Sequence, residues 1–335
     1  MKGHDAIKLD PREGHYRIPS HHVGLSLFLR HLAPKGGPGD RIALYVHGAT
    51  FPSALSIAYR FDGRSWRDEL CAAGFDVWGL DFHGFGRFSD PYPEMDQPAE
   101  GIPPLGRAED ASRQIEKAVR FITSHHGTQR VSIIAHSWGT MAAGRFAGRC
   151  PELVDRLVLF GPVVWRSKQT EATRLPGWRL ITVQDQWDRF VADVPKGHPP
   201  VLLKRHFGEW GDRYLDCDYQ SRTRSPAAVQ VPNGPSQDVL DAWAGELAYD
   251  PALIRAPASI IRGEWDSLAT DADARWLFDA LKGASMKWDV KIAKGTHLMH
   301  LEESRYALYR ATECFLLGRD LPTVASDDYE RIKGV

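Results

Sequence analysis

One serine in this chain follows a short apolar run and has small residues two positions away on each side. The run is Val131-Ser-Ile-Ile-Ala-His, the serine is Ser137, and its small neighbours are Ala135 and Gly139. A serine hydroxyl is a weak nucleophile, so it must stand clear of the backbone where a base can reach it. A sharp strand-to-helix turn exposes the hydroxyl in this way, at the cost of a strained serine backbone. Taken alone, the stretch also fits a serine that only caps a helix.

Two later segments supply the other groups that a serine nucleophile needs. An apolar run at 258–262 leads into Gly263-Glu-Trp-Asp266, and a second at 286–292 leads into Lys294-Gly-Thr-His297. A histidine can take the serine proton, and a carboxylate can hold that histidine in the correct tautomer. We therefore assign Ser137 as nucleophile, His297 as base and Asp266 as orienting acid. The rivals are His300, expected to begin the last helix, Glu264, and Asp271 and Asp273, expected at a helix N-terminus.

An early turn offers groups that could stabilise a developing oxyanion. It is Val46-His47-Gly48-Ala49-Thr50, at the end of an apolar run. A tetrahedral intermediate needs two backbone N–H donors, which we assign to Ala49 and to Trp138, the residue after the nucleophile. The candidate substrate contacts are His47, His136, Trp187 and Trp210, for each of which simple packing is the alternative.

Short apolar runs alternate with amphipathic segments over most of the chain, which predicts a mostly parallel sheet flanked by helices. Because the carboxyl ends of parallel strands share one edge, the three catalytic candidates should meet there. Strands are expected at 16–18 and 24–32 (an antiparallel hairpin), 41–46, 75–81, 131–135, 156–160, 258–262 and 286–292. Helices are expected at 65–73, 107–125, from the elbow to Cys150, and at 236–249, 271–281 and 304–316, before a loose polar tail.

In order and spacing these motifs resemble the α/β-hydrolase superfamily, in its cap-bearing branch of serine esterases, lactonases and proline iminopeptidase-like enzymes. The resemblance implies an α/β-hydrolase fold with an inserted helical cap, a serine nucleophile, no cofactor and no metal. In two places the chain departs from the pattern. Ala135 replaces the usual first Gly, and His83 replaces an Arg, which puts a structural ion pair in doubt. The matching motifs are His47-Gly48, Asp81-Phe-His-Gly84-Phe-Gly86-Arg-Phe-Ser89, Ala135-His-Ser137-Trp-Gly139, Gly263-Glu-Trp-Asp266 and Gly295-Thr-His297.

The regular alternation stops between residues 163 and 235, a stretch rich in Trp, Arg, Asp and Pro. This segment lies where the family places its lid, and we call residues 163–235 the cap segment. The predicted organisation is a core of 1–162 and 236–335, interrupted by that cap. Most cap aromatics should hold the cap together, while a few could line an apolar pocket. The polar groups that could anchor a substrate are Arg174, Arg179, Arg205, Glu209, Asp212, Asp216 and Asp218, all of which could equally be solvated.

The composition of the chain limits the classes of molecule that it is expected to bind. The 335-residue chain has a formal net charge of −1 and mixed-sign charges, which favours neither nucleic acid nor a membrane surface. The N-terminus has no apolar signal core, and Cys71, Cys150, Cys217 and Cys314 are widely spaced. We therefore expect a cytoplasmic protein with reduced thiols and no zinc site, as a monomer or a homodimer. The pairs His21-His22 and His125-His126 lack a carboxylate at metal-ligand spacing and are interpreted as surface histidines.

The expected reaction is hydrolysis of a small-molecule carboxylic ester or lactone with an apolar or aromatic portion. Amide hydrolysis is the first alternative, because proline iminopeptidase-like enzymes share the Ser-Trp-Gly elbow and hold a substrate amine with cap carboxylates. Against it, the chain has His-Gly-Ala-Thr where those enzymes have His-Gly-Gly-Pro-Gly. C–C bond hydrolysis, and a small-molecule receptor with a slow triad, stay open as further alternatives.

Overall fold

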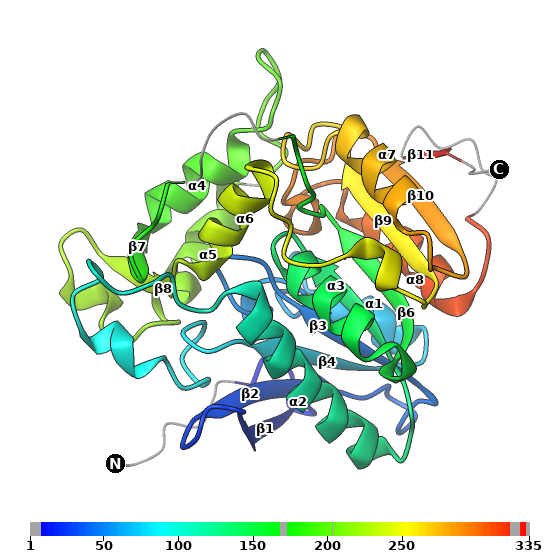
Figure 1. The fold of residues 1–335 in the computed structure, drawn as a ribbon, viewed down its shortest axis with the longest axis horizontal. Helices are drawn as coiled ribbons and strands as arrows, with labels where there is room; N and C mark the ends of the chain where they lie inside the picture. The colour runs from blue at the N-terminus through cyan, green and yellow to red at the C-terminus, as the bar shows by residue number, and fades with distance from the viewer. Residues whose placement is uncertain (1–7, 168–172, 203, 322–328, 333–335) are drawn as a thin grey trace.

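A computed structural model describes residues 8–167, 173–202, 204–321 and 329–332 (Figure 1). The expectation for the extreme N-terminus, residues 1–7, and parts of those for the cap segment and the tail lie outside these residues. Within them, nine strands form one sheet in the order β1-β2-β4-β3-β5-β6-β9-β10-β11. These are β1 (Gly14–Pro19), β2 (Ser26–Leu32), β3 (Arg41–Val46), β4 (Phe75–Asp81), β5 (Val131–His136), β6 (Val154–Phe160), β9 (Ala258–Gly263), β10 (Lys287–Ile292) and β11 (Tyr329–Ile332).

In the middle of this sheet, the six strands β4, β3, β5, β6, β9 and β10 run parallel to one another. This confirms the predicted fold class. At one edge β1 and β2 form the predicted antiparallel hairpin, and β2 joins β4 antiparallel. At the other edge β11 pairs antiparallel with β10. The expectation of a loose tail was therefore wrong for residues 329–332, because a polar sequence can still add to an exposed strand edge through its backbone.

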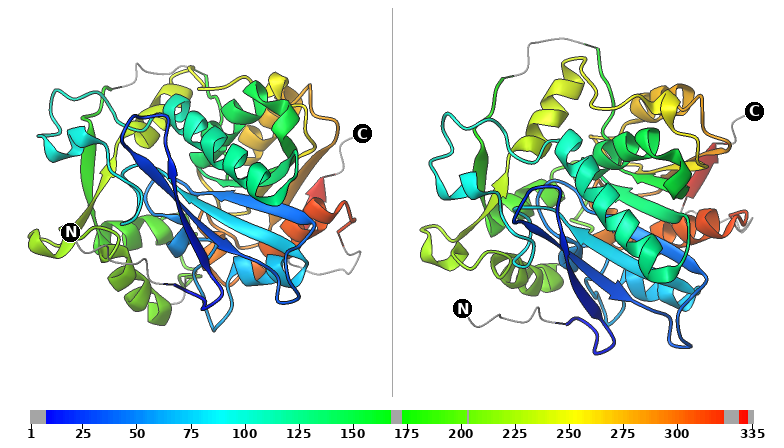
Figure 2. Two further views of the ribbon diagram at one scale, coloured as in Figure 1. Left: turned by 90° about the horizontal axis from the view of Figure 1, so that it is seen from below. Right: turned by 60° about the horizontal axis from the view of Figure 1, so that its bottom comes forward.

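Helices cover both faces of the sheet, and Figure 2 shows the two layers. Side chains alternate between the two faces along β3, so each face has its own apolar core. Leu44 packs in the core beneath α2, α3 and α7, whereas Tyr45 packs in the core beneath α1 and α8. None of the helices in the described part of the chain is long and apolar enough to cross a membrane. The helices are α1 (Trp66–Ala72), α2 (Ala108–His126), α3 (Gly139–Arg149), α6 (Gly234–Trp243), α7 (Asp271–Ala280) and α8 (Arg305–Leu317).

Local sequence signals account for several helix ends. Ser65 and Thr270 each begin a helix through a capping box with an aspartate three residues later. Gly127 ends α2 in the left-handed conformation, where a glycine has no Cβ to clash. One prediction was too long: α6 ends at Trp243, where the chain turns, and does not continue to 249.

The cap segment contains more than helices. It has α4 (Val183–Val191) and α5 (Lys204–Leu215), but also a two-stranded antiparallel ribbon of β7 (Trp178–Thr182) and β8 (Ala228–Pro232). The expectation of a helical cap is corrected in this respect, because strands 45 residues apart leave no local hairpin signal. The division into core and cap at 163 and 235 stays a prediction.

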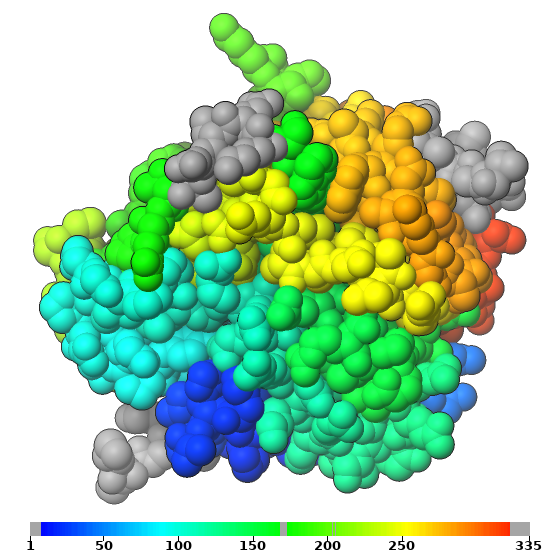
Figure 3. All heavy atoms as spheres, viewed as in Figure 1, coloured from blue at the N-terminus to red at the C-terminus, as the bar shows by residue number. Residues whose placement is uncertain are grey.

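The long loop between β4 and α2 fastens this ribbon to the core. Trp178 Nε1 donates to the Gln97 carbonyl at 2.9 Å, and Gln230 Nε2 donates to the Met95 carbonyl at 2.7 Å. In the space-filling view this loop, in cyan, lies directly beside the green cap surface (Figure 3). The cap therefore rests on the core through a second element besides its own two connections.

A buried ion network holds the N-terminal hairpin against the core. Glu13 is 1% exposed and accepts from Arg30 at 2.6 Å and from Arg67 at 2.7 Å. Burial alone would raise the pKa of Glu13, but its hydrogen bonds and the two guanidinium charges hold that pKa well below its usual range. Arg30 Nε also donates to Ser53 Oγ. The N–H and the hydroxyl of Ser53 in turn donate to Asp81. The network thus reaches the loops that follow β3 and β4.

Replacing Glu13 by alanine should destabilise the protein by roughly 3–5 kcal/mol, because two buried guanidinium groups lose their counter-charge. The measurement is the free energy of unfolding in urea. The matched control is Glu209→Ala, which breaks a surface pair with Arg213 and should cost only about 0–1 kcal/mol. If both variants lost the same free energy of unfolding, the buried network would not stabilise the protein more than a surface ion pair does.

Candidate active site

Ser137 occupies a strained turn between β5 and α3. Its φ is +56°, a conformation that costs a non-glycine residue energy. Its N–H donates to the Phe160 carbonyl on β6 at 2.9 Å. The turn also needs Gly139, where an added Cβ would lie 2.3 Å from the His47 carbonyl oxygen. The chain therefore forms the sharp elbow expected from the sequence, with only room for a glycine at 139.

The loops after β9 and β10 bring Asp266 and His297 to this elbow. His297 Nε2 lies 2.7 Å from Ser137 Oγ, and His297 Nδ1 lies 3.0 Å from each carboxylate oxygen of Asp266. The hydrogen-bond network assigns the proton to Nδ1, leaving Nε2 as the acceptor. Ser137 is 7% exposed, and His297 and Asp266 are 1% and 4% exposed. The three residues predicted from separate strand ends are thus in contact in one enclosed place.

Asp266 is held in its charged form. Burial by itself would raise its pKa, but the His297 ring and two backbone donors reverse this and lower it. The donors are the N–H groups of Leu268 at 2.9 Å and Ala269 at 3.1 Å. A buried carboxylate fixed in this way keeps the imidazole oriented and can stabilise the imidazolium form.

The turn after β3 packs directly on the elbow. An added Cβ at Gly48 would lie 3.1 Å from Ser137 Cβ and 3.2 Å from His136 Nδ1. Among the described residues, no hydrogen-bond acceptor faces the backbone N–H of Ala49 or that of Trp138. Two free donors at the turn and at the N-terminus of α3 have the chemistry that an oxyanion requires.

The rings of His47 and His136, predicted as substrate contacts, are buried and contact the backbone around the site. Their role in substrate binding stays a prediction. His47 is fully buried, with Nδ1 2.8 Å from the Gly48 carbonyl and Nε2 accepting from the Phe82 N–H. His136 is 2% exposed, and its Nε2 lies 3.0 Å from the His297 carbonyl. Both imidazoles therefore brace the backbone of the site.

Trp210 joins the cap to the core. Its ring is fully buried, its Nε1 donates to the Leu55 carbonyl at 3.0 Å, and it lies edge-on to Phe51 with ring centroids 5.3 Å apart. Trp187 is half-buried and touches Phe207 edge-on with centroids 5.0 Å apart. Of these two cap tryptophans, Trp187 and Trp210, only Trp187 keeps surface for another molecule.

The rivals for the base and acid have other roles. His300 lies in a short helical turn, Met299–Leu301, and does not begin α8 as expected. Burial and the nearby His297 lower its pKa to about 3, so the ring stays neutral. Asp273 closes the capping box of α7, as predicted. Glu264 Oε2 accepts from the Lys294 N–H at 2.9 Å.

His83, which stands where the family pattern has Arg, is buried and forms hydrogen bonds in place of an ion pair. Its Nδ1 lies 2.7 Å from the Asp90 carbonyl and its Nε2 lies 2.7 Å from Ser20 Oγ. Burial lowers its pKa, which favours the neutral ring. A neutral histidine thus links two loops, the one between β1 and β2 and the one between β4 and α2, where a charged residue was expected.

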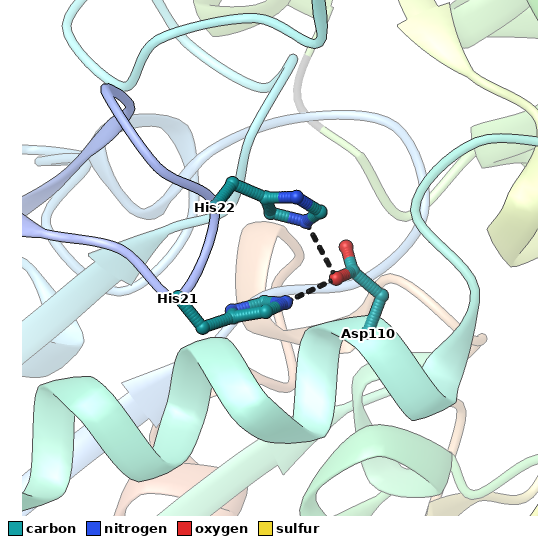
Figure 4. A group of neighbouring side chains, drawn as sticks. All are labelled: His21, His22 and Asp110. Carbon is teal, nitrogen blue, oxygen red and sulfur yellow. Dashed lines mark hydrogen bonds and ion pairs between the residues drawn. The ribbon is translucent and has the colours of Figure 1, made fainter.

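Two groups of histidines and carboxylates could hold a metal ion. Figure 4 shows the first, in which Asp110 Oδ1 lies 2.6 Å from His21 Nε2 and 2.7 Å from His22 Nε2. The interpretation of these histidines as carboxylate-free was wrong, because Asp110 comes from a distant part of the chain. The other Asp110 oxygen accepts from Tyr92 and Gln114, so ordinary hydrogen bonds already explain the group. The second group is His31, Asp76 and His126.

Sequence reasoning missed two residues that shape the site. Asp238 on α6 accepts from Trp138 Nε1 at 2.8 Å and also from Arg107, so it links the elbow to α2. Arg189 on α4 lies within electrostatic range of Asp266 and His136. Neither had a signal in the sequence, since both meet the site from segments without a motif.

Comparison with known proteins identifies the family of this fold. Residues 50–304 match the family described as alpha/beta hydrolase fold. No curated protein matches the chain. Among solved structures, a thermophilic esterase from Thermogutta terrifontis with malate bound is 16% identical, covers 91% of this chain and 98% of its own, and has a TM-score of 0.56.

Two further structures share the fold. Epoxide hydrolase A from Mycobacterium thermoresistibile is 13% identical over 92% of this chain and 100% of its own, with a TM-score of 0.61. The monoacylglycerol lipase of Paleococcus ferrophilus is 18% identical over 88% of this chain and 99% of its own, with a TM-score of 0.55. The chain belongs to the α/β-hydrolase fold family and is a hydrolytic enzyme of that family.

Proposed function

We propose that this protein is a serine hydrolase that cleaves a carboxylic ester of a small molecule through an acyl-enzyme. The observation that carries the proposal is the continuous chain of hydrogen bonds from Ser137 through His297 to Asp266. Ser137 Oγ attacks the carbonyl carbon while His297 Nε2 takes its proton. The imidazolium then protonates the leaving alcohol, and a water activated by the same ring releases the acid.

The N–H groups of Ala49 and Trp138 would bind the oxyanion of the tetrahedral intermediate. Their lack of acceptors among the described residues supports this role. The mechanism needs no metal and no cofactor, because the charge that develops is met by these donors and by His297.

An ester fits the site better than an amide carrying a substrate amine. Three of the cap carboxylates that were predicted as possible amine contacts already have an arginine partner: Glu209 with Arg213, Asp216 with Arg222, and Asp218 with Arg224. Lactone and C–C bond hydrolysis use the same triad and stay as alternatives. Two of the structural neighbours named above are an esterase and a lipase, which agrees with an ester substrate but does not identify it.

Ser137→Ala should abolish hydrolysis of p-nitrophenyl butanoate and labelling by a fluorophosphonate, with a loss of several orders of magnitude in kcat/KM. The matched control is Ser132→Ala on the same strand, whose hydroxyl donates to Asp155 away from the triad. Circular dichroism checks that both variants fold. Undiminished labelling of the Ser137 variant would rule out the assigned nucleophile. In the receptor alternative, the wild-type protein would label but turn over far below about 1 per second.

A second buried carboxyl, that of Glu302, holds Thr296, the residue before His297. The N–H of Thr296 donates to it at 3.1 Å, and so does the Thr296 hydroxyl. Burial raises the pKa of Glu302 from its ordinary 4.5 to about 8. Between these two values the folded protein keeps a proton that the unfolded chain has lost. The free energy of unfolding therefore falls as pH rises through this window.

Glu302→Gln should remove this pH dependence, because glutamine does not ionise. In urea denaturation at several pH values, the stability of the variant relative to wild type should rise by up to about 1.4 kcal/mol per pH unit between pH 5 and 8. The exposed neighbour Glu303 gives the control, since Glu303→Gln should leave the wild-type slope unchanged. Parallel profiles for wild type and Glu302→Gln would show that Glu302 is already ionised.

Trp187 and Trp210, the two cap tryptophans predicted to contact substrate, should respond differently to substitution. Trp187→Ala should mainly raise KM for bulky apolar esters, at a cost of about 1–3 kcal/mol in kcat/KM, and affect acetate esters much less. Trp210→Ala should instead lower the free energy of unfolding by roughly 3–5 kcal/mol, because its buried ring leaves a cavity. The measurements are kcat/KM on short and long p-nitrophenyl esters, and urea denaturation. Equal losses on both esters for a folded Trp187 variant would make this ring part of the cap core only.

A further inference from the structure

The side chain of Trp138, the residue after the nucleophile, makes a buried hydrogen bond that the triad itself does not require. Its Nε1 donates to Asp238 Oδ2 at 2.8 Å, and its ring lies edge-on to Phe82 with centroids 5.5 Å apart. Trp138 is 1% exposed and Asp238 is 2% exposed. The polar end of the indole is therefore held by a buried carboxyl of α6.

Two further donors converge on the carboxyl of Asp238. Its Oδ2 also accepts from the N–H of Ala108, the first residue of α2, at 2.6 Å, and its Oδ1 accepts from Arg107 Nε. Burial raises the pKa of Asp238, while the charge of Arg107 and the hydrogen bonds from the three donors oppose that rise. A carboxyl that only accepts hydrogen bonds takes the role of its ionised form. Asp238 thus joins the start of α3 to the start of α2.

Helix α6, which carries Asp238, is itself fixed near its start. The side chain of Gln237 accepts from the N–H of Leu175 in the cap segment at 2.8 Å. The N–H of Gly234 donates to the Leu105 carbonyl, in the loop before α2, at 2.7 Å. The carboxyl of Asp238 is therefore presented by an element with bonds to both the cap segment and the core, and it can serve as a fixed point for the indole.

The backbone of Trp138 lies at the most strained point of the site. It follows Ser137, whose φ is +56°, and it begins α3. A strained turn keeps its shape only when its neighbours hold it. On one side Gly139 packs against the His47 carbonyl. The bond between the indole and Asp238 is the hold on the side chain, and it restricts how far the Trp138 backbone, with its N–H, can rotate.

The simplest alternative is that Asp238 only satisfies a buried N–H. An unpaired donor in the core lowers the stability of a protein, so a partner would be useful whatever the reaction. Removing Asp238 would then lower the free energy of unfolding and leave the chemical step of the folded enzyme unchanged. The position of the bond argues for more, because its donor belongs to the residue after the nucleophile and its acceptor to a helix that is itself fixed.

We propose that Asp238 is a positioning residue for the reaction, which holds the indole of Trp138 and so aims the backbone N–H of Trp138 at the oxyanion. The inference rests on the proposed ester hydrolysis and its oxyanion donors. Such a donor stabilises the transition state only when it points at the place where the negative charge develops, and a small displacement removes much of its effect. Asp238 should therefore act on kcat and leave the binding of the ground-state ester nearly unchanged.

The test measures kcat and KM for p-nitrophenyl butanoate and the inhibition constant of an alkyl trifluoromethyl ketone, whose adduct with a serine carries the oxyanion. The variants are Asp238→Ala, Trp138→Phe and the double variant. Trp138→Phe removes the indole N–H and keeps an aromatic ring. Asp241→Ala is the control, because Asp241 also accepts from Arg107 but receives its other side-chain bond from Gln237. Urea denaturation shows which variants fold.

Asp238→Ala and Trp138→Phe should each lower kcat by about tenfold to a hundredfold, while KM changes by less than about threefold. The inhibition constant of the ketone should rise by a similar factor, because the adduct needs the same N–H. The double variant should lose no more than either single variant, since both remove one hydrogen bond. Asp241→Ala should keep the wild-type kcat.

A wild-type kcat in folded Asp238→Ala or Trp138→Phe would overturn the positioning role, and so would an unchanged affinity for the ketone or losses that add in the double variant. If Asp238→Ala does not fold, Trp138→Phe decides alone, because it leaves the ion pair of Asp238 with Arg107 in place. A wild-type protein that does not hydrolyse the ester would instead overturn the proposed ester hydrolysis.

Discussion

The close contact between the elbow and the turn after β3 is the constraint on which the site depends. Gly139 leaves no space for a Cβ against the His47 carbonyl, and Gly48 leaves little against Ser137. This contact forces the positive φ of Ser137 and lifts its hydroxyl toward His297. It also sets the turn that carries Ala49 against the start of α3. The strain is stored in a turn held on both sides by buried parallel strands, which is where a protein can maintain it.

The sequence predicted this arrangement well because its signals are local. Each strand of the parallel sheet is a short apolar run, and Ser137, Asp266 and His297 each follow one within a few residues. Parallel strands put those positions on one edge whatever the detail of their packing. The elbow glycine needed no structure to recognise, since a side chain at that spacing would be excluded. The fold class followed from the alternation of apolar and amphipathic segments, and the proposed triad from spacing together with the resemblance to α/β-hydrolases.

The features that the sequence did not predict all depend on contacts between distant segments. The ribbon of β7 and β8 joins strands with two helices between them, and Asp110 reaches two histidines from another element. The complete burial of His47 and Trp210 could not be predicted for the same reason, because it depends on the segments that surround them. Whether a residue is buried depends on the segments that pack around it in the folded protein. Its type and its position beside a motif do not determine this.

Electrostatics around His297 follows from the same packing. Burial and like charge lower the pKa of His136 and His300, so both rings beside the base stay neutral. The charged group that contacts His297 is Asp266, whose pKa is lowered by that ring and by two backbone donors. A loop of the core therefore supplies the negative charge at the proposed triad. Because the cap is a separate segment of the chain, substitutions in the cap can change substrate selectivity while the sheet keeps His297 and Asp266 in place.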